Sequence, residues 1–139
     1  MSRFSNWQRP KIEDGKPTHW NWVVQHVEGF SLGERTDIGA FTYINARNGV
    51  AIGDDAQIGS HCSIYSVSTV DEKAGAVSVG RNARVGAHCV IMPGVTIGEN
   101  AVVGAFSFVN ANIPADVTAF GQPARVIRQT GAKEMHHGR

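Results

Sequence analysis

Residues 79–114 read VGRNARVGAHCVIMPGVTIGENAVVGAFSFVNANIP, and an aliphatic residue begins every hexad of this stretch. The spacing extends back to residue 32, and glycine usually follows the aliphatic residue. The full series is Leu32, Ile38, Ile44, Ile52, Ile58, Ile64, Val79, Val85, Ile91, Ile97, Val103 and Val109. A period of six fits neither an α-helix, with a period of about 3.6, nor a half-buried strand, with a period of about 2. Such a fixed period predicts a repeat architecture.

The hexads fall into groups of three. The first hexads of the groups are LGERTD, IGDDAQ, VGRNAR and IGENAV, and they resemble one another more than they resemble their neighbours. The higher unit is therefore a coil with three faces, which predicts a triangular parallel β-helix. The four coils are 32–51, 52–78, 79–96 and 97–114, with two extra residues in the first and nine in the second.

Two residues of each hexad are expected to point inward, the aliphatic residue and the small or modest residue four places later, with glycine near the corners. The second set is Thr36, Thr42, Asn48, Ala56, Cys62, Ser68, Ala83, Cys89, Val95, Ala101 and Ser107. We predict an all-β chain with an N-terminal cap over 1–31 and a β-helix of about four coils over 32–114, interrupted by a loop at 70–78. A C-terminal strand, a short helix and a tail are expected over 115–139.

Composition bounds the class of protein and gives no activity. The 139 residues suit one domain. With 13 Lys+Arg against 12 Asp+Glu, the charge of +1 gives no sign of a nucleic-acid or membrane partner. No apolar run approaches the roughly 18 residues of a membrane span, and the start lacks the apolar core of a signal peptide. These features, with two cysteines, predict a cytoplasmic protein in a reducing compartment.

The motifs IGSHCS and VGAHCV, at 58–63 and 85–90, place a His-Cys pair in the same setting twice. By the repeat, Cys62 and Cys89 are expected to be buried, stacked, free thiols. The preceding His61 and His88 are expected to point outward in one column, which reads Phe41, His61, His88, Phe106. Either histidine can be an interface residue, and a stacked pair at a subunit seam also favours a functional role.

Outward aromatic and aliphatic residues are dense near this column. A lone prism would expose them as a large apolar patch, so we expect burial against other copies of the chain, in a homotrimer matched to the three faces. The segment 1–31 lacks the hexad pattern and carries Trp7, Trp20 and Trp22. We expect it to cap the first coil, and Trp20 or Trp22 could instead stack on a sugar or a nucleotide base.

The repeat [LIV]-G-x-x-[small]-x resembles the hexapeptide acyltransferase family. Residues 77–128, which end in FGQPARVIR, are especially similar to maltose and galactoside O-acetyltransferases and to sugar N-acetyltransferases of surface-polysaccharide pathways. The resemblance implies a left-handed β-helix and a trimer with acetyl-CoA bound between subunits. It further implies transfer of an acyl group to an amino or hydroxyl group of a sugar, such as a nucleotide-linked amino sugar.

Residue by residue, the resemblance places acetyl-CoA near six positions. Backbone groups of the second face match Ala87 and Ala105, and the ending matches Gly121, Pro123, Arg125 and Arg128. The two arginines are expected to contact the CoA phosphates because a guanidinium matches phosphate oxygens. The family often carries Thr-Lys where this chain has Asn110 and Ala111, so one cationic contact is missing.

The acceptor site departs from the sugar O-acetyltransferases. Their catalytic histidine aligns with Thr69, which cannot act as a base, while His61 aligns with an asparagine that contacts the acceptor. We rank His61 first and His88 second as general base, with Tyr65, Ser66 and Thr69 as substrate contacts. The missing histidine favours N-acylation, because an amine needs less activation than a hydroxyl.

Two other functions stay open. γ-Class carbonic anhydrases share this fold, but they need three histidine ligands, two of them five residues apart, and the histidines here lack that spacing, so we predict no metal. A trimeric scaffold or binding module is the second, and the FGQPARVIR ending argues against it. The sequence leaves open the acyl group and the sugar.

Overall fold

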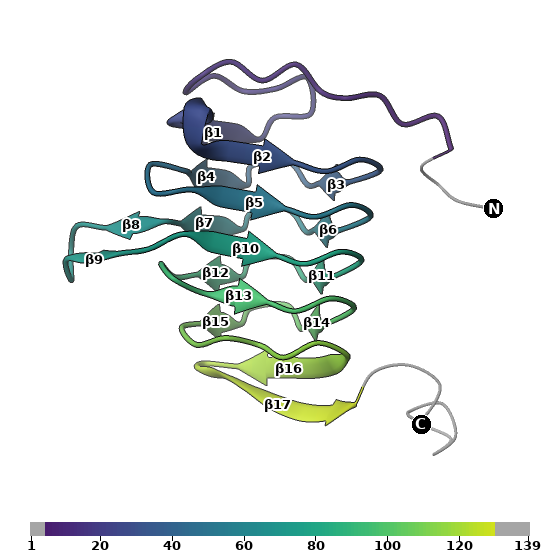
Figure 1. Cartoon of the computed structure of the whole chain (residues 1–139), viewed down its shortest axis with the longest axis vertical. Helices are drawn as coiled ribbons and strands as arrows, with labels where there is room; N and C mark the ends of the chain where they lie inside the picture. The colour runs from purple at the N-terminus through teal and green to yellow at the C-terminus, as the bar shows by residue number, and fades with distance from the viewer. Residues whose placement is uncertain (1–4, 130–139) are drawn as a thin grey trace.

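The computed structural model describes residues 5–129, and it is a β-solenoid whose coils stack along one axis and whose strands form three sheets along that axis (Figure 1). The first sheet contains β1 (Val23–Gln25), β4 (Tyr43–Asn45), β7 (Ser63–Tyr65), β12 (Val90–Ile91) and β15 (Phe108–Val109). The second contains β2 (Phe30–Leu32), β5 (Val50–Ile52), β10 (Val77–Val79) and β13 (Thr96–Ile97). The third contains β3 (Asp37–Ile38), β6 (Gln57–Ile58), β11 (Arg84–Val85), β14 (Val102–Val103), β16 (Val117–Gly121) and β17 (Ala124–Gln129). The all-β parallel helix is confirmed.

The aliphatic hexad residues form the core. Ile44, Ile64, Ile91 and Val109 are aligned in register across the first sheet, and all four are fully buried. Each buried aliphatic side chain of this size contributes about 1.5–3 kcal/mol relative to exposure, and stacking them every coil makes one continuous core. Glycine after the aliphatic residue has a steric cause, since a Cβ on Gly86 would lie 2.6 Å from the Ala105 nitrogen of the next coil.

The second inward set is correct except at two positions. Asn48 is exposed and Ser68 is only half-buried, while Ala46 and Ser66 are the buried residues there. The cause is the extra residues of coils one and two, which lie between the first and second sheets. After them, Val50 and Val77 return to the same register and are buried.

The solenoid is longer than the four predicted coils because the N-terminal segment contributes strands of its own. β1 pairs with β4, with Val24 opposite Ile44, and therefore begins the first sheet ahead of residue 32. A short 3-10 turn, η1 (Val27–Gly29), links β1 to β2. The preceding residues run across this end of the stack, where the sequence predicts a cap, and Trp22 packs there against Phe30 with ring centroids 6.3 Å apart (Figure 1).

The C-terminal part differs from the prediction. Where a short helix was expected, β16 and β17 form an antiparallel hairpin that closes the other end of the third sheet. Ala124 is buried and the rest of β17 is exposed, a pattern that reads as an edge strand. The predicted tail, with His136 and His137, lies outside the described residues. Within residues 5–129, no helix is long and apolar enough to cross a membrane.

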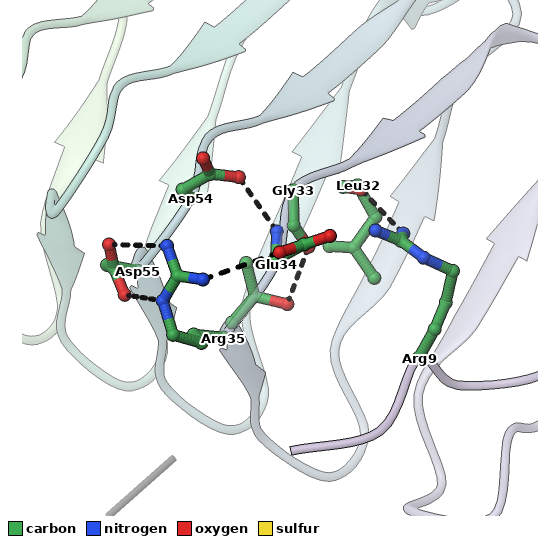
Figure 2. Close-up of polar contacts among 8 residues, drawn as sticks. Arg9, Leu32, Gly33, Glu34, Arg35, Asp54 and Asp55 are labelled. Atoms are coloured by element: carbon green, nitrogen blue, oxygen red, sulfur yellow. Dashed lines mark hydrogen bonds and ion pairs between the residues drawn. The ribbon is translucent and has the colours of Figure 1, made fainter. Parts of the chain in front are cut away.

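Each coil turns at three corners, and at two of them a non-glycine residue adopts the left-handed backbone region in every coil. The second and third sheets meet at the polar corner, formed by Arg35, Asp55, Asn82, Asn100 and Asp116, all with φ near +60°. Figure 2 shows the first rungs, where the Arg35 guanidinium donates to the Asp55 carboxylate at 2.8 Å. This hydrogen bond raises the pKa of Arg35 and lowers the pKa of Asp55. Short polar residues suit this backbone because their side chains bond locally.

The third corner, between the first and second sheets, holds the insertions. In coil two, β8 (Val67–Ser68) and β9 (Lys73–Ala74) form an antiparallel hairpin that projects from the stack (Figure 1). In coil three a tight turn with Gly94 at φ 84° takes the same place.

Candidate active site

The corner between the third and first sheets, which we call the aromatic corner, consists of Phe41, His61, His88 and Phe106. The His61 and His88 rings lie 4.7 Å apart between centroids and within 7° of parallel. His88 stacks on Phe106 at 4.8 Å and 5°, and Phe41 meets His61 at 5.2 Å with a tilt of 44°. The predicted outward column is therefore a stack of four rings, each from a different coil.

The stack follows from the backbone of this corner. All four residues have positive φ, between 59° and 67°. Their amides bond one coil back, as when the His88 N–H donates to the Ser60 carbonyl at 3.0 Å and the Phe106 N–H donates to the Ala87 carbonyl at 2.9 Å. This conformation is uncommon for large side chains and costs free energy at each coil. Repeating it in every coil turns all four rings outward along one edge.

A hollow of about 420 Å³ lies beside the His88 and Phe106 rings of this corner. Its lining residues are His88, Val90, Phe106, Ser107, Phe108, Asn110, Gln122 and Pro123. The C-terminal hairpin makes one wall, because the Gln122 amide donates to the Phe106 carbonyl at 2.8 Å and the Gly121 N–H donates to the Ser107 hydroxyl at 3.1 Å. The Gln122–Pro123 peptide bond in this wall is cis.

The hollow brings together one predicted base and one predicted cofactor residue, His88 and Pro123. His61 lies one coil away, in contact with His88 but outside the lining. Ala87 precedes His88, and Ala105 lines a shallow groove along the third sheet. Gly121 joins the hairpin wall through its N–H.

Arg125 and Arg128 lie exposed on β17, beyond the hollow. They are opposite Phe120 and Thr118 of β16 in the hairpin register. The segment for which a short helix was predicted is the strand β17, so neither guanidinium lies at the end of a helix.

The three predicted acceptor residues are separated. Tyr65 is half-buried on the first sheet, with its ring 6.0 Å from that of Tyr43. Thr69 is exposed in the turn of the β8–β9 hairpin, at the third corner and across the first sheet from His61. Ser66 is a correction to the prediction, because it is fully buried. Its hydroxyl donates to the Asn45 carbonyl at 2.8 Å and accepts from the Asn48 N–H at 2.9 Å, so it closes the corner.

The two thiols are free and buried, as the repeat predicts. Cys62 Sγ donates to the Gly86 carbonyl at 3.2 Å, and Cys89 Sγ donates to the Gly104 carbonyl at 3.1 Å. The hydrogen bond with Cys89 and burial raise the pKa of the Cys62 thiol well above its usual range. A protonated thiol inside the solenoid is a packing group and no nucleophile.

Among residues 5–129, no group of three or more His, Cys, Asp and Glu side chains is placed to hold a metal ion. Sequence reasoning missed Asn110, Gln122 and Phe108 as lining residues. The position of Gln122 within the FGQPARVIR ending marks it as a candidate site residue. The hairpin that brings Gln122 to the aromatic corner lies outside the hexad repeat, so periodicity does not predict it.

Two family models match the chain. The model for bacterial transferase hexapeptide (six repeats) matches residues 76–111, and the model for the hexapeptide repeat of succinyl-transferase matches residues 29–66. Both fall within the coils and leave the C-terminal hairpin unmatched.

Curated relatives are acetyltransferases by name. The chain is 34% identical over 108 residues to WcaF of Escherichia coli strain K12, a protein assigned to colanic acid biosynthesis as an acetyltransferase. This match covers 78% of the chain and 54% of the relative. A match at 45% identity over 47 residues to the galactoside O-acetyltransferase of the same strain covers 34% of the chain and 23% of the relative. The chain thus spans about half the length of WcaF and about a quarter of the second.

A solved structure resembles most of the chain. The hexapeptide-repeat-containing acetyltransferase of Vibrio cholerae superposes with a TM-score of 0.75 at 27% identity, covering 80% of this chain and 68% of that one. That protein has also been solved in complex with acetyl coenzyme A.

Proposed function

Since this chain belongs to the hexapeptide-repeat transferase family, we propose that it is a CoA-dependent acyltransferase, with acetyl-CoA as donor and a sugar amino or hydroxyl group as acceptor. The named activities of WcaF and of galactoside O-acetyltransferase support acetyl transfer, and the acetyl-CoA complex of the Vibrio protein supports the donor. An acetyl-CoA donor also suits the cytoplasmic address expected from the sequence.

The observation that carries the proposal is the hollow shared by His88 and Pro123. In this hollow the column of outward histidines meets the C-terminal hairpin. That hairpin carries the FGQPARVIR ending on which the family resemblance rests. A thioester held along the hairpin would reach the two imidazoles from the C-terminal side. The acceptor would then lie on the side of His61, one coil further toward the N-terminus.

In this arrangement His61 acts as general base. Its imidazole takes the proton from the attacking amine or hydroxyl as the new N–C or O–C bond forms at the thioester carbonyl. The C–S bond then breaks, and the proton passes from the imidazolium to the departing CoA thiolate. The base contributes about 10²–10⁴ in rate, and N–H donors directed at the oxyanion add to it.

The donor would be held by backbone and charge. Ala87 and Ala105 offer main-chain groups for the pantetheine amides, and Gly121 and Pro123 shape the wall. Arg125 and Arg128 are exposed guanidinium groups on one edge strand, suited to the phosphates because each offers a fork of donors. Among the acceptor contacts we retain Tyr65 and Thr69 and withdraw Ser66.

A second copy would complete the site. Phe41 is 64% exposed and Phe106 60% exposed, at the two ends of the aromatic corner. Two exposed rings flanking the predicted base favour a neighbouring subunit as the missing wall, in the homotrimer expected from the sequence. Thr69 would then serve the site through the projecting hairpin of one subunit reaching the next. We favour an amino sugar linked to a nucleotide as acceptor, because Thr69 takes the place of a catalytic histidine and an amine needs less activation than a hydroxyl.

The test is a titration of acetyl-CoA followed by thermal unfolding and then by thiol release with nucleotide amino sugars. Ligand at about 100 times Kd adds about 2.7 kcal/mol of stability, which raises the unfolding temperature by several degrees. Binding together with acceptor-dependent thiol release supports the transferase. Absence of any thermal shift at millimolar acetyl-CoA would instead support the scaffold.

A further inference from the structure

A second hollow lies at the opposite end of the solenoid from the hairpin. It measures about 290 Å³ and is enclosed by the N-terminal segment and the start of the third sheet. Three indoles line it, those of Trp7, Trp20 and Trp22. The polar side chains of Asn6, Gln8 and Asp37 line it as well. None of these residues belongs to the hollow beside His88.

The main chain on both sides of Trp20 is held in place, and the Trp20 side chain is 52% exposed. The Thr18 hydroxyl accepts from the N–H groups of Trp20 and Trp22, at 3.2 and 3.3 Å. Asn21 turns the chain between the two tryptophans at φ 68°, and its N–H donates to the Thr18 carbonyl at 2.9 Å. The His19 ring then packs edge-on against Trp20, at 5.0 Å and 89°. A fixed, exposed indole is a contact surface that loses little entropy on binding.

We propose that this hollow is a carbohydrate subsite that binds a pyranose ring. A pyranose has two faces of C–H groups and a rim of hydroxyls. An indole provides a flat apolar face for the first, and amide and carboxylate side chains provide hydrogen-bond partners for the second. Trp20 supplies the exposed face, while Asn6, Gln8 and Asp37 supply both donors and acceptors at the rim.

The mix of side chains favours a sugar over a cation. A quaternary ammonium ligand would use the ring faces and the Asp37 carboxylate, but it has no donors or acceptors for the Asn6 and Gln8 amides. The Trp7 ring already has the Arg9 guanidinium at 5.3 Å from its centroid. A further cation there would meet a like charge, whereas a neutral sugar would not.

Asp37 connects this hollow to the rest of the molecule. It also lines the shallow groove of the third sheet, where Gln57 and Arg84 follow it in register, one per coil. A sugar chain seated on Trp20 would continue along these polar side chains toward Ala105, which lines the same groove. Only one part of the inference rests on the proposed function, namely that the subsite binds one end of an extended acceptor. Sugar binding itself requires no acyl transfer.

The test is saturation-transfer NMR together with tryptophan fluorescence, on the wild-type chain without acetyl-CoA, using maltotetraose, chitotetraose and galactotetraose as probes. We expect at least one tetrasaccharide to bind with a Kd of about 0.1–5 mM. Trp20→Ala should weaken that binding about tenfold or more, and Asp37→Asn should weaken it less. Trp22 is buried in the core, so replacing it would change the stability of the fold as well as any sugar binding. The test therefore leaves Trp22 unchanged.

Phe120→Ala is the matched control, because Phe120 is 53% exposed at the other end of the solenoid. It should leave the sugar affinity unchanged. The inference is overturned if no tetrasaccharide binds, if Trp20→Ala binds as well as wild type, or if only choline, tested in parallel, quenches the fluorescence. Sugar binding without acetyl-CoA binding would overturn the proposed function and leave the subsite standing, and the reverse result would do the opposite.

Discussion

His61 and His88 lie on adjacent coils with their imidazole rings nearly parallel and 4.7 Å apart, and only His88 lines the hollow beside the hairpin. The same backbone conformation places both rings, so the pair differs in surroundings and not in geometry. Under the proposed function we therefore expect separate roles, with His61 toward the acceptor and His88 toward the thioester.

Replacing His61 by asparagine should lower kcat about 10²–10⁴-fold, because a general base is lost. Asparagine is the right replacement, since it tolerates the positive φ of this corner. Acetyl-CoA-induced thermal stabilisation should be retained, which separates chemistry from donor binding. His88→Asn should instead weaken donor binding. Equal activity of His61→Asn and wild type in the thiol-release assay would remove His61 from the mechanism.

Replacing Arg125 by alanine should weaken acetyl-CoA binding about tenfold, in line with the roughly 1.5–3 kcal/mol of a charged hydrogen bond and the exposure of the side chain. Isothermal titration measures the change, and raising the salt concentration should shrink it. Arg47→Ala, an exposed arginine in coil one, is the control. If both variants bind acetyl-CoA as wild type does, the phosphates lie elsewhere.

Replacing Phe41 and Phe106 together by asparagine should lower the mass of the particle from trimer toward monomer. Both rings are exposed in the single chain and flank the histidines, so a subunit seam would bury them. Sedimentation velocity checks this at micromolar protein. Arg47→Asn, at an exposed position of coil one outside the projecting β8–β9 hairpin, serves as the surface control. A monomeric wild type would contradict the expectation directly.

Replacing Ile91 by alanine should lower the free energy of unfolding by about 2–5 kcal/mol, because its side chain is fully buried between equivalent aliphatic residues of the adjacent coils. Urea denaturation measures the loss. Val70→Ala, at a position 97% exposed, should change it by no more than about 0.5 kcal/mol. Similar losses in the two variants would mean that coil three does not carry the core.

The repeat decided how much of this molecule was predictable. The position of Ile91, Cys89 and His88 within the hexad was enough to predict which side chains point inward and which outward, because every coil repeats the same pattern. Asn48 and Ser68 were misplaced because extra residues shift the register locally, and β17 was missed because its exposed Val126 and Ile127 fit an edge strand as well as a helix. The hollow beside His88 depends on Gln122 meeting the Phe106 carbonyl, a contact between segments that no periodicity encodes.

The third corner has a practical consequence for engineering. Coil one accommodates two extra residues there and coil two accommodates nine, yet Val50 and Val77 keep their register. Corner length is thus decoupled from core geometry, and the Gly94 turn of coil three is a splice point for a peptide epitope or a tag. A graft at that turn would be displayed clear of the aromatic corner, once per chain.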